Sequence, residues 1–263
     1  MVSDNLSALY EKLPSGVKLV AVSKFHPVSR LMEAYDAGQR LFGENRPQEL
    51  AQKVPQMPSD VQWHFIGHLQ TNKLKLVLPY VSMVQSVDSF HLLEAIDKWG
   101  RDNGKVIDIL LELHLGAEET KHGFCEEEIL SIVEAGKGIP SQTASTSFRP
   151  LPPQAAGPSL LCGRGWPQVC EGTPSPAGEK PVLCNVRIRG LMGMATNTED
   201  EGVIEKDFAR IEALFKRIRA EHPELADTFT ELSIGMSGDW PIAVRHGATM
   251  VRIGTDIFGP REY

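Results

Sequence analysis

The chain has 263 residues, of which 41% are hydrophobic and 23% charged, a composition typical of a globular protein with a substantial core. Its formal net charge of −7 argues against nucleic-acid or anionic-membrane partners, which are usually met by a basic surface. Charged residues interrupt the first twenty positions and no run reaches the roughly 18 apolar residues of a membrane span, so we expect a cytoplasmic protein without a signal segment.

Eight short, mainly apolar runs follow one another along the chain, separated by stretches with helical periodicity. The ranges predicted as strands are 18–22, 40–43, 62–66, 82–85, 107–113, 186–192, 230–234 and 249–253. Apolar strands of this kind are typical of parallel sheets covered on both faces. The pattern predicts one (β/α)8 TIM barrel domain over residues 1–263. An open doubly wound sheet is the alternative, but its glycine-rich turn is missing after the first strand.

Two of the intervening stretches show clear helical signals. Residues 28–38 have apolar positions at helical spacing and end at Gly38, a typical C′ residue. Residues 201–221 place one apolar side opposite Lys206, Arg210 and Lys216. The expected apolar side of that helix is formed by Val203, Phe208, Ile211, Leu214, Phe215 and Ile218. Both patterns indicate core packing.

One stretch, residues 139–184, breaks this alternation. It contains nine of the 18 prolines and three of the four cysteines, but five charged residues. Proline at this density blocks regular hydrogen bonding, and few apolar residues are available to compensate for the loss of chain entropy. We expect a disordered insertion in a helix-to-strand loop, on the face opposite a barrel's site. The four cysteines have no metal-ligand spacing, so no metal site is predicted.

Barrel sites are built at the carboxyl ends of the strands. The last two predicted strands are followed by loops with glycine and hydroxyl residues, Ser237 in one and Gly254 with Thr255 in the other. Barrels often hold a phosphate between these two loops, so the pair predicts a phosphate site. An isolated Ser237 would be no more than a helix N-cap.

Lys24 follows the first strand and therefore lies beside the eighth strand when a barrel closes. An amine next to a phosphate site indicates a ligand with both a phosphate and a carbonyl, which lysine can hold as a Schiff base. Arg252, in the eighth strand, is a second cation near this amine. The alternative for Lys24 is an ordinary loop cation.

Seven segments, in order, resemble the YggS/PROSC family of pyridoxal-phosphate-binding proteins, which are similar to the barrel domain of alanine racemase. The segments are AVSKFHP, FGENRPQEL, WHFIGHLQTNK, KHGF, RGLMGMA, LSIGMSGDW and VRIGTDIFG. The resemblance covers about residues 15–138 and 185–263. Phe25 departs from the family, where threonine is commoner, and so does the stretch 139–184.

The resemblance implies that pyridoxal 5′-phosphate is bound as a Schiff base on Lys24. It further implies that Arg252 faces the pyridine nitrogen and that Asn45 lies near the cofactor. The phosphate would be held by Ser237, Gly254 and Thr255.

Two further residues are weaker candidates. Lys121 matches a family lysine linked to cofactor transfer or secondary binding, but from the sequence it is equally a solvated surface lysine. His68 could line the entrance or be structural.

Three functions fit a barrel with such a lysine. The first is a carrier or buffer in pyridoxal phosphate homeostasis, with apo-enzymes as recipients and without robust catalysis. The second is an amino-acid racemase, which needs bases on both faces of the cofactor. No tyrosine falls in a strand-end motif, and no second domain is expected to supply one. The third, a class I aldolase, usually has its lysine on the sixth strand, where none occurs. We therefore expect a carrier, and a monomer because no apolar stripe lacks a core to pack on.

Overall fold

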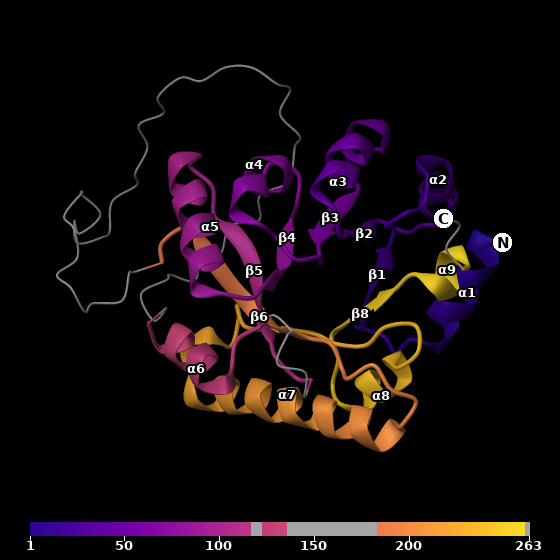
Figure 1. The fold of residues 1–263 in the computed structure, drawn as a ribbon. Coiled ribbons are helices and arrows are strands. Elements are labelled where there is room, and N and C mark those ends of the chain that lie inside the picture. Colours follow the sequence, from indigo (N-terminus) through magenta and orange to yellow (C-terminus); the bar gives the residue numbers. More distant parts are fainter. Residues whose placement is uncertain (117–122, 136–182, 261–263) are drawn as a thin grey trace.

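A computed structural model describes residues 1–116, 123–135 and 183–260 (Figure 1). Eight parallel strands close into a barrel in which each strand pairs with the next and β8 pairs with β1. This confirms the predicted (β/α)8 barrel. The strands are β1 (Lys18–Val22), β2 (Leu41–Glu44), β3 (Gln62–Phe65), β4 (Met83–Val87), β5 (Ile107–Leu113), β6 (Val186–Gly193), β7 (Glu231–Ser233) and β8 (Met250–Ile253).

The helices surround the barrel, and α1 at the start of the chain lies beside α9 near its end (Figure 1). The α-helices are α1 (Val2–Lys12), α2 (Val28–Asp36), α3 (Pro47–Lys53), α4 (Leu74–Val77), α5 (Phe90–Asp102), α6 (Glu126–Ala135), α7 (Glu201–Glu221), α8 (Trp240–Arg245) and α9 (Thr255–Phe258). Short 3-10 turns are η1 (Val54–Gln56), η2 (Thr71–Lys73) and η4 (Pro223–Leu225).

The two predicted helices are confirmed. Helix α2 ends at Asp36, and Gly38 has a φ of +98°, the left-handed conformation that terminates helices. Helix α7 has the predicted bounds, but its buried side includes Ile204 in place of Val203, which is half-buried.

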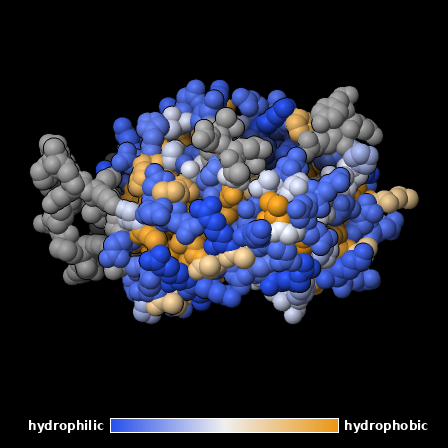
Figure 2. Space-filling view, turned by 60° about the horizontal axis from the view of Figure 1, so that its bottom comes forward, coloured by the Kyte–Doolittle hydropathy of each residue, from blue (hydrophilic) through white to orange (hydrophobic). Residues whose placement is uncertain are grey.

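The face turned forward in Figure 2 is mainly hydrophilic, with hydrophobic residues in smaller patches.

The core has two parts. The larger packs the outside of the barrel against the helices and includes Phe42, Phe65 and Phe208. The smaller lies inside the barrel, where Val20, Met83, Leu110, Met192 and Met250 form one cluster from five strands. Met83 and Met250 begin their strands, Val20 and Leu110 lie mid-strand, and Met192 lies near the carboxyl end of β6, so apolar side chains fill the barrel interior up to the level of the mouth.

The predicted insertion, residues 139–184, lies outside the described residues except at its end. Leu183 is buried there, and Asp97 on α5 accepts hydrogen bonds from the backbone N–H groups of Cys184 (2.8 Å) and Asn185 (2.6 Å). Among the described elements, α6 ends at Ala135 and β6 begins at Val186. Asp97 therefore fixes the point at which the chain enters β6.

Within the described ranges, no helix is long and apolar enough to cross a membrane. Nor do these residues include a group of three or more His, Cys, Asp or Glu side chains arranged to hold a metal ion.

Gly190 lies at a close approach between strands. The β5–β6 register shifts opposite this residue, and its φ of +151° belongs to a region that side chains rarely adopt. A Cβ atom here would lie 1.7 Å from the carbonyl oxygen of Glu231 on β7. A side chain at this position would therefore push β6 and β7 apart.

We predict that Gly190→Ala lowers the free energy of unfolding by about 3 kcal/mol or more, because both the clash and the φ angle oppose it. Urea denaturation measures the change. Gly238→Ala is the control, since a Cβ there meets nothing within 4 Å and the expected change is within about 0.5 kcal/mol. Equal stability of the two variants would contradict the close approach.

Candidate cofactor-binding site

The carboxyl ends of the eight parallel strands open on one mouth of the barrel. Lys121 lies outside the described residues. The other predicted site residues all occur at or just after these strand ends: Lys24 after β1, Asn45 after β2, His68 after β3, Ser237 after β7, Arg252 within β8, and Gly254 and Thr255 after β8. The fold thus brings to one end of the barrel residues that are up to 231 positions apart, from 24 to 255.

The segment that carries Lys24 turns sharply. Ser23 is buried and Lys24 half-buried, and Phe25 has a φ of +68°, the left-handed conformation that a phenylalanine rarely adopts. The backbone N–H of Phe25 donates to Glu49 Oε2 at 2.9 Å, and the Arg46 guanidinium lies 4.3 Å from the centre of the Phe25 ring. Residues on and just before α3 therefore hold the turn that follows Lys24.

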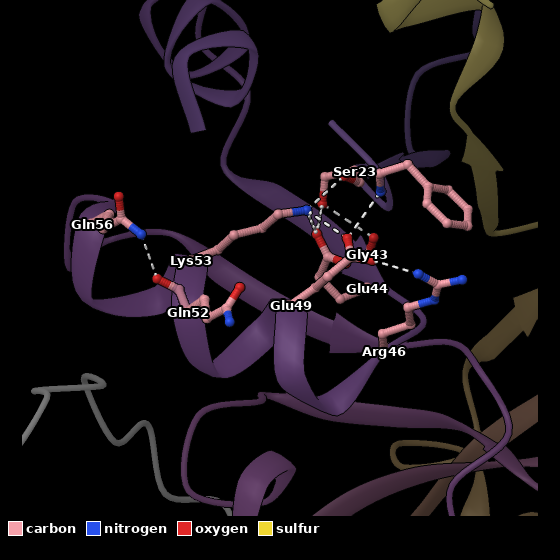
Figure 3. Close-up of polar contacts among 9 residues, drawn as sticks. Ser23, Gly43, Glu44, Arg46, Glu49, Gln52, Lys53 and Gln56 are labelled. Carbon is pink, nitrogen blue, oxygen red and sulfur yellow. Dashed lines mark hydrogen bonds and ion pairs between the residues drawn. The ribbon is translucent and has the colours of Figure 1, made fainter. Parts of the chain in front are cut away.

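Behind this turn lies a buried ion-pair cluster formed by Glu44, Glu49 and Lys53, which Figure 3 shows with Ser23. Lys53 Nζ lies 2.7 Å from Glu44 Oε1 and 3.1 Å from Glu49 Oε2. Burial raises the pKa of Glu44, although Lys53 opposes the change. Burial also acts to raise the pKa of Glu49, but hydrogen bonds from Phe25 and Lys53 outweigh it and lower the value.

A chain of hydrogen bonds crosses the inside of the barrel from β8 to β3. Arg252 Nη1 donates to Ser233 Oγ (2.6 Å), which donates to Gln85 Oε1 (2.7 Å). Gln85 Nε2 in turn lies 2.7 Å from His64 Nδ1. Burial lowers the pKa of His64 to about 3, with the Lys18 charge adding to the effect, so this ring is neutral and accepts at Nδ1. Each of these four side chains therefore has a hydrogen-bond partner within the barrel interior.

Arg252 is held in place by backbone groups as well. Its guanidinium also donates to the carbonyl oxygens of Ser233 (2.7 Å) and Gly193 (2.8 Å). Burial lowers the pKa of Arg252 to about 10, while the charges of Glu112 and Asp239 act against the shift. Arg252 therefore remains a fixed cation at neutral pH, just below the mouth.

The loops after β7 and β8 are joined to each other. The Arg252 N–H donates to Gly235 O at 2.9 Å, and the Ser237 side chain hydrogen-bonds to the Asp256 carboxylate. A Cβ on Gly254 would lie 3.1 Å from Val22 O, so glycine lets the β8 loop run close to β1. A phosphate contact through the Ser237 hydroxyl requires that side chain to turn away from Asp256.

Two buried side-chain oxygens at the end of β2 have no hydrogen-bond partner within the part of the chain that the structure describes: Glu44 Oε2, in the ion-pair cluster, and Asn45 Oδ1, just after the strand. Buried polar atoms in native proteins nearly always have a partner, so Asn45 Oδ1, at the mouth, indicates a ligand group beside it. With a lysine amine, a fixed guanidinium cation and two loops rich in glycine and hydroxyl groups, the residues fit a ligand that carries a phosphate and an aldehyde.

The residues that support this mouth were not predicted from the sequence. Glu49 and Lys53 are spaced i,i+4 with glutamate first, a pattern that usually describes a solvated helix face. His64, Gln85, Glu112 and Ser233 are polar residues within mainly apolar strands, which is the signal that could have identified them. His68 Nδ1 lies at hydrogen-bond distance, 2.8 Å, from Asp88 Oδ2, and the His68 side chain is 47% exposed.

Comparison with known proteins agrees with the fold. The family described as alanine racemase, N-terminal domain, matches residues 1–146. A pyridoxal phosphate homeostasis protein of Vibrio alginolyticus is 31% identical, covering 96% of this chain and 90% of the relative. One of Mus musculus is 33% identical over 94% and 77% of the two chains. PipY of Synechococcus elongatus, solved with pyridoxal phosphate bound, is 30% identical with a TM-score of 0.73, covering 98% of this chain and all of PipY.

The fold and the matched residues define a barrel protein of the alanine racemase N-terminal type. The chain belongs to the family of pyridoxal phosphate homeostasis proteins.

Glu112 on β5 is a buried carboxylic acid near the mouth, and its titration has a measurable consequence. Burial raises its pKa from 4.5 to about 7, the Asp88 charge adds to this, and Arg252 opposes it. A raised folded-state pKa means that the stability contribution of Glu112 is present below about pH 4.5 and is lost as the pH rises through 7.

We predict that Glu112→Gln, which resembles the protonated acid, becomes more stable than the parent protein as the pH rises from 5 to 8. The gain in the free energy of unfolding should be about 2 to 3 kcal/mol, measured on ligand-free protein by urea denaturation at each pH. Glu94→Gln on the exposed side of α5 is the control and should leave the pH profile unchanged. Parallel profiles for all three proteins would contradict the raised pKa.

Proposed function

We propose that this protein binds pyridoxal 5′-phosphate and acts in its homeostasis as a carrier or buffer, with Lys24 as the covalent attachment point. The observation that carries the proposal is the pairing of β1 with β8, which sets Val20 opposite Arg252 and so brings Lys24 beside the β8 loop. The bound cofactor supplies an aldehyde that an amine can hold. The PipY structure, which contains this cofactor, supports the proposal that the protein binds pyridoxal phosphate.

Each remaining residue has a binding role in this proposal. Ser237, Gly254 and Thr255 hold the phosphate. Arg252, a fixed cation, faces the pyridine nitrogen and keeps it unprotonated, which weakens the cofactor as an electron sink. Asn45 supplies its buried Oδ1 and amide at the edge of the site.

Secondary binding or transfer is assigned to Lys121 and to His68 at the rim. Apo-enzymes that need the cofactor are the proposed recipients, and the protein acts as a monomer.

The positions of the tyrosines support binding over catalysis. Tyr10 hydrogen-bonds to Gln39, Tyr35 donates to Asp60 at 2.8 Å, and Tyr80 precedes β4. Gln39 and Asp60 precede β2 and β3, so these three tyrosines lie at the amino ends of the strands, opposite the proposed site. Tyr263 lies outside the described residues. An amino-acid racemase remains the alternative function.

The cofactor proposal predicts an absorbance band near about 420 nm when purified protein is mixed with pyridoxal phosphate. Lys24→Ala should abolish the band, because the attaching amine is lost. Borohydride followed by peptide mass spectrometry should locate the pyridoxyl group on Lys24, and Lys75→Ala, an exposed lysine on α4, should behave like the parent. A parent protein that develops no band would refute the proposal.

A racemisation assay with L-alanine separates the carrier from the racemase. We expect negligible turnover by protein loaded with the cofactor, since no described tyrosine reaches the site. If slow turnover occurs, Glu112, with a pKa near 7, is suited to serve as the second base, and Glu112→Gln should remove it. Robust turnover would overturn the carrier role.

A further inference from the structure

We propose that Lys53 and Glu49 are positioning residues for Lys24, because they hold the backbone groups on either side of it and so set the direction in which its amine meets the cofactor. The inference rests on the proposed role of Lys24 as the attachment point. Neither residue belongs to the strands or loops that would touch the ligand, since both lie on α3.

The first step is the geometry of the backbone on both sides of Lys24. Lys53 Nζ donates to the carbonyl oxygen of Ser23 at 2.9 Å, and Glu49 Oε2 accepts from the N–H of Phe25 at 2.9 Å. The same two side chains form an ion pair with each other at 3.1 Å (Figure 3). One closed set of contacts therefore spans the residue before Lys24, the residue after it and one face of α3.

The second step is the rigidity of this arrangement. An ammonium group has three donors, and Lys53 uses them on Ser23 O, Glu44 Oε1 and Glu49 Oε2. The Lys53 side chain is 9% exposed and that of Glu44 is fully buried. Water cannot easily replace these contacts, so a buried charge network of this kind opposes movement of the groups that it holds.

The third step is the conformation of Phe25. Its φ of +68° is unfavourable for a residue with a large side chain and persists where surrounding contacts impose it. Here the Glu49 carboxylate binds the N–H and the Arg46 guanidinium covers the ring. Without these contacts the backbone after Lys24 is expected to relax toward an extended conformation, which would turn the amine away from its present direction.

The cluster also has a simpler interpretation, in which it only anchors α3 to the barrel. That helix already packs in the core through Leu50, which is fully buried. The two interpretations predict different effects of changing these residues. If they position Lys24, the variants lose the rate of covalent attachment but keep their affinity for the phosphate and ring, because only the direction of the amine changes. If they only anchor α3, rate and affinity change together.

The experiment measures how fast the band near about 420 nm grows when protein is mixed with excess pyridoxal phosphate, across a pH series. It also measures the affinity for pyridoxine 5′-phosphate, which has the phosphate and ring but no aldehyde. The variants are Lys53→Met and Glu49→Gln. The control is Lys216→Met, which removes a lysine from an exposed i,i+4 ion pair with Glu212 on α7.

We expect Lys53→Met to slow band formation by about tenfold or more, and Glu49→Gln by a smaller factor, while pyridoxine phosphate affinity changes by less than about twofold. Lys216→Met should match the parent. The pH at which band formation is half-maximal should also shift in Lys53→Met, because the surroundings of the Lys24 amine change.

Two results would overturn the positioning role. One is a parental rate in Lys53→Met; the other is a loss of pyridoxine phosphate affinity equal to the loss of rate. If Lys53→Met does not fold because Glu44 is left unpaired, Glu49→Gln decides the question by the same criteria. A parent protein without any band would instead refute the proposed function, so the two failures are distinguishable.

Discussion

The pairing of β1 with β8 is the constraint on which the candidate site depends. Four register pairs, from Lys18 opposite Met250 to Ala21 opposite Ile253, join strands from opposite ends of the chain. Strand β7 contributes less backbone pairing to this seam, since a single register pair, Ser233 opposite Met250, links it to β8. Side chains complete the junction: Glu231 binds Lys18 and Thr249 at the amino ends, and Arg252 binds Ser233 near the mouth. The closure that stabilises the barrel also brings the carboxyl end of β1, which Lys24 follows, beside the carboxyl end of β8.

Two of the buried cations, Lys53 and Arg252, lie near the mouth, and their partners differ. Lys53 contacts two carboxylates directly, whereas Arg252 donates to carbonyl and hydroxyl oxygens and has Glu112 and Asp239 as more distant charges. Burying a charge is tolerated when it is paired or fully hydrogen-bonded. The first arrangement fixes the backbone around Lys24. The second fixes a buried cation just below the mouth.

The strands and their order were predicted closely, because each strand is a short apolar run. Strands of a parallel barrel are covered on both faces, so they need such runs. The strand-end residues were also predicted, since Lys24, Ser237 and Gly254 each interrupt an apolar or glycine-rich pattern. Lys53 was missed because a glutamate-to-lysine i,i+4 pair on a short helix usually marks a solvated face. Whether such a pair points to water or into the barrel wall is decided by the crossing of α3 over β1 and β2, which no local pattern encodes. The raised pKa of Glu112 likewise depends on burial and on the charge of Asp88, and both result from contacts between residues far apart in the sequence.

The polar groups in and around the barrel are better suited to binding a cofactor than to catalysis with it. Inside the barrel, the chain of hydrogen bonds from Arg252 through Ser233 and Gln85 ends at a neutral His64. These contacts hold the Arg252 cation in place, and the His64 ring has no acidic proton to donate at neutral pH. A guanidinium at the ring nitrogen would keep that nitrogen unprotonated, and a neutral pyridine is a weaker electron sink than the pyridinium that amino-acid chemistry requires. Catalysis would also need a mobile acid or base on the face opposite Lys24. Among the described residues, Glu112 is a buried carboxylate whose pKa is raised to about 7, close to that of a useful base. The charge of Arg252 opposes this rise. In the proposed binding mode, the Arg252 guanidinium would therefore weaken both the electron sink and the second base, which supports the proposal of storage and delivery of the cofactor.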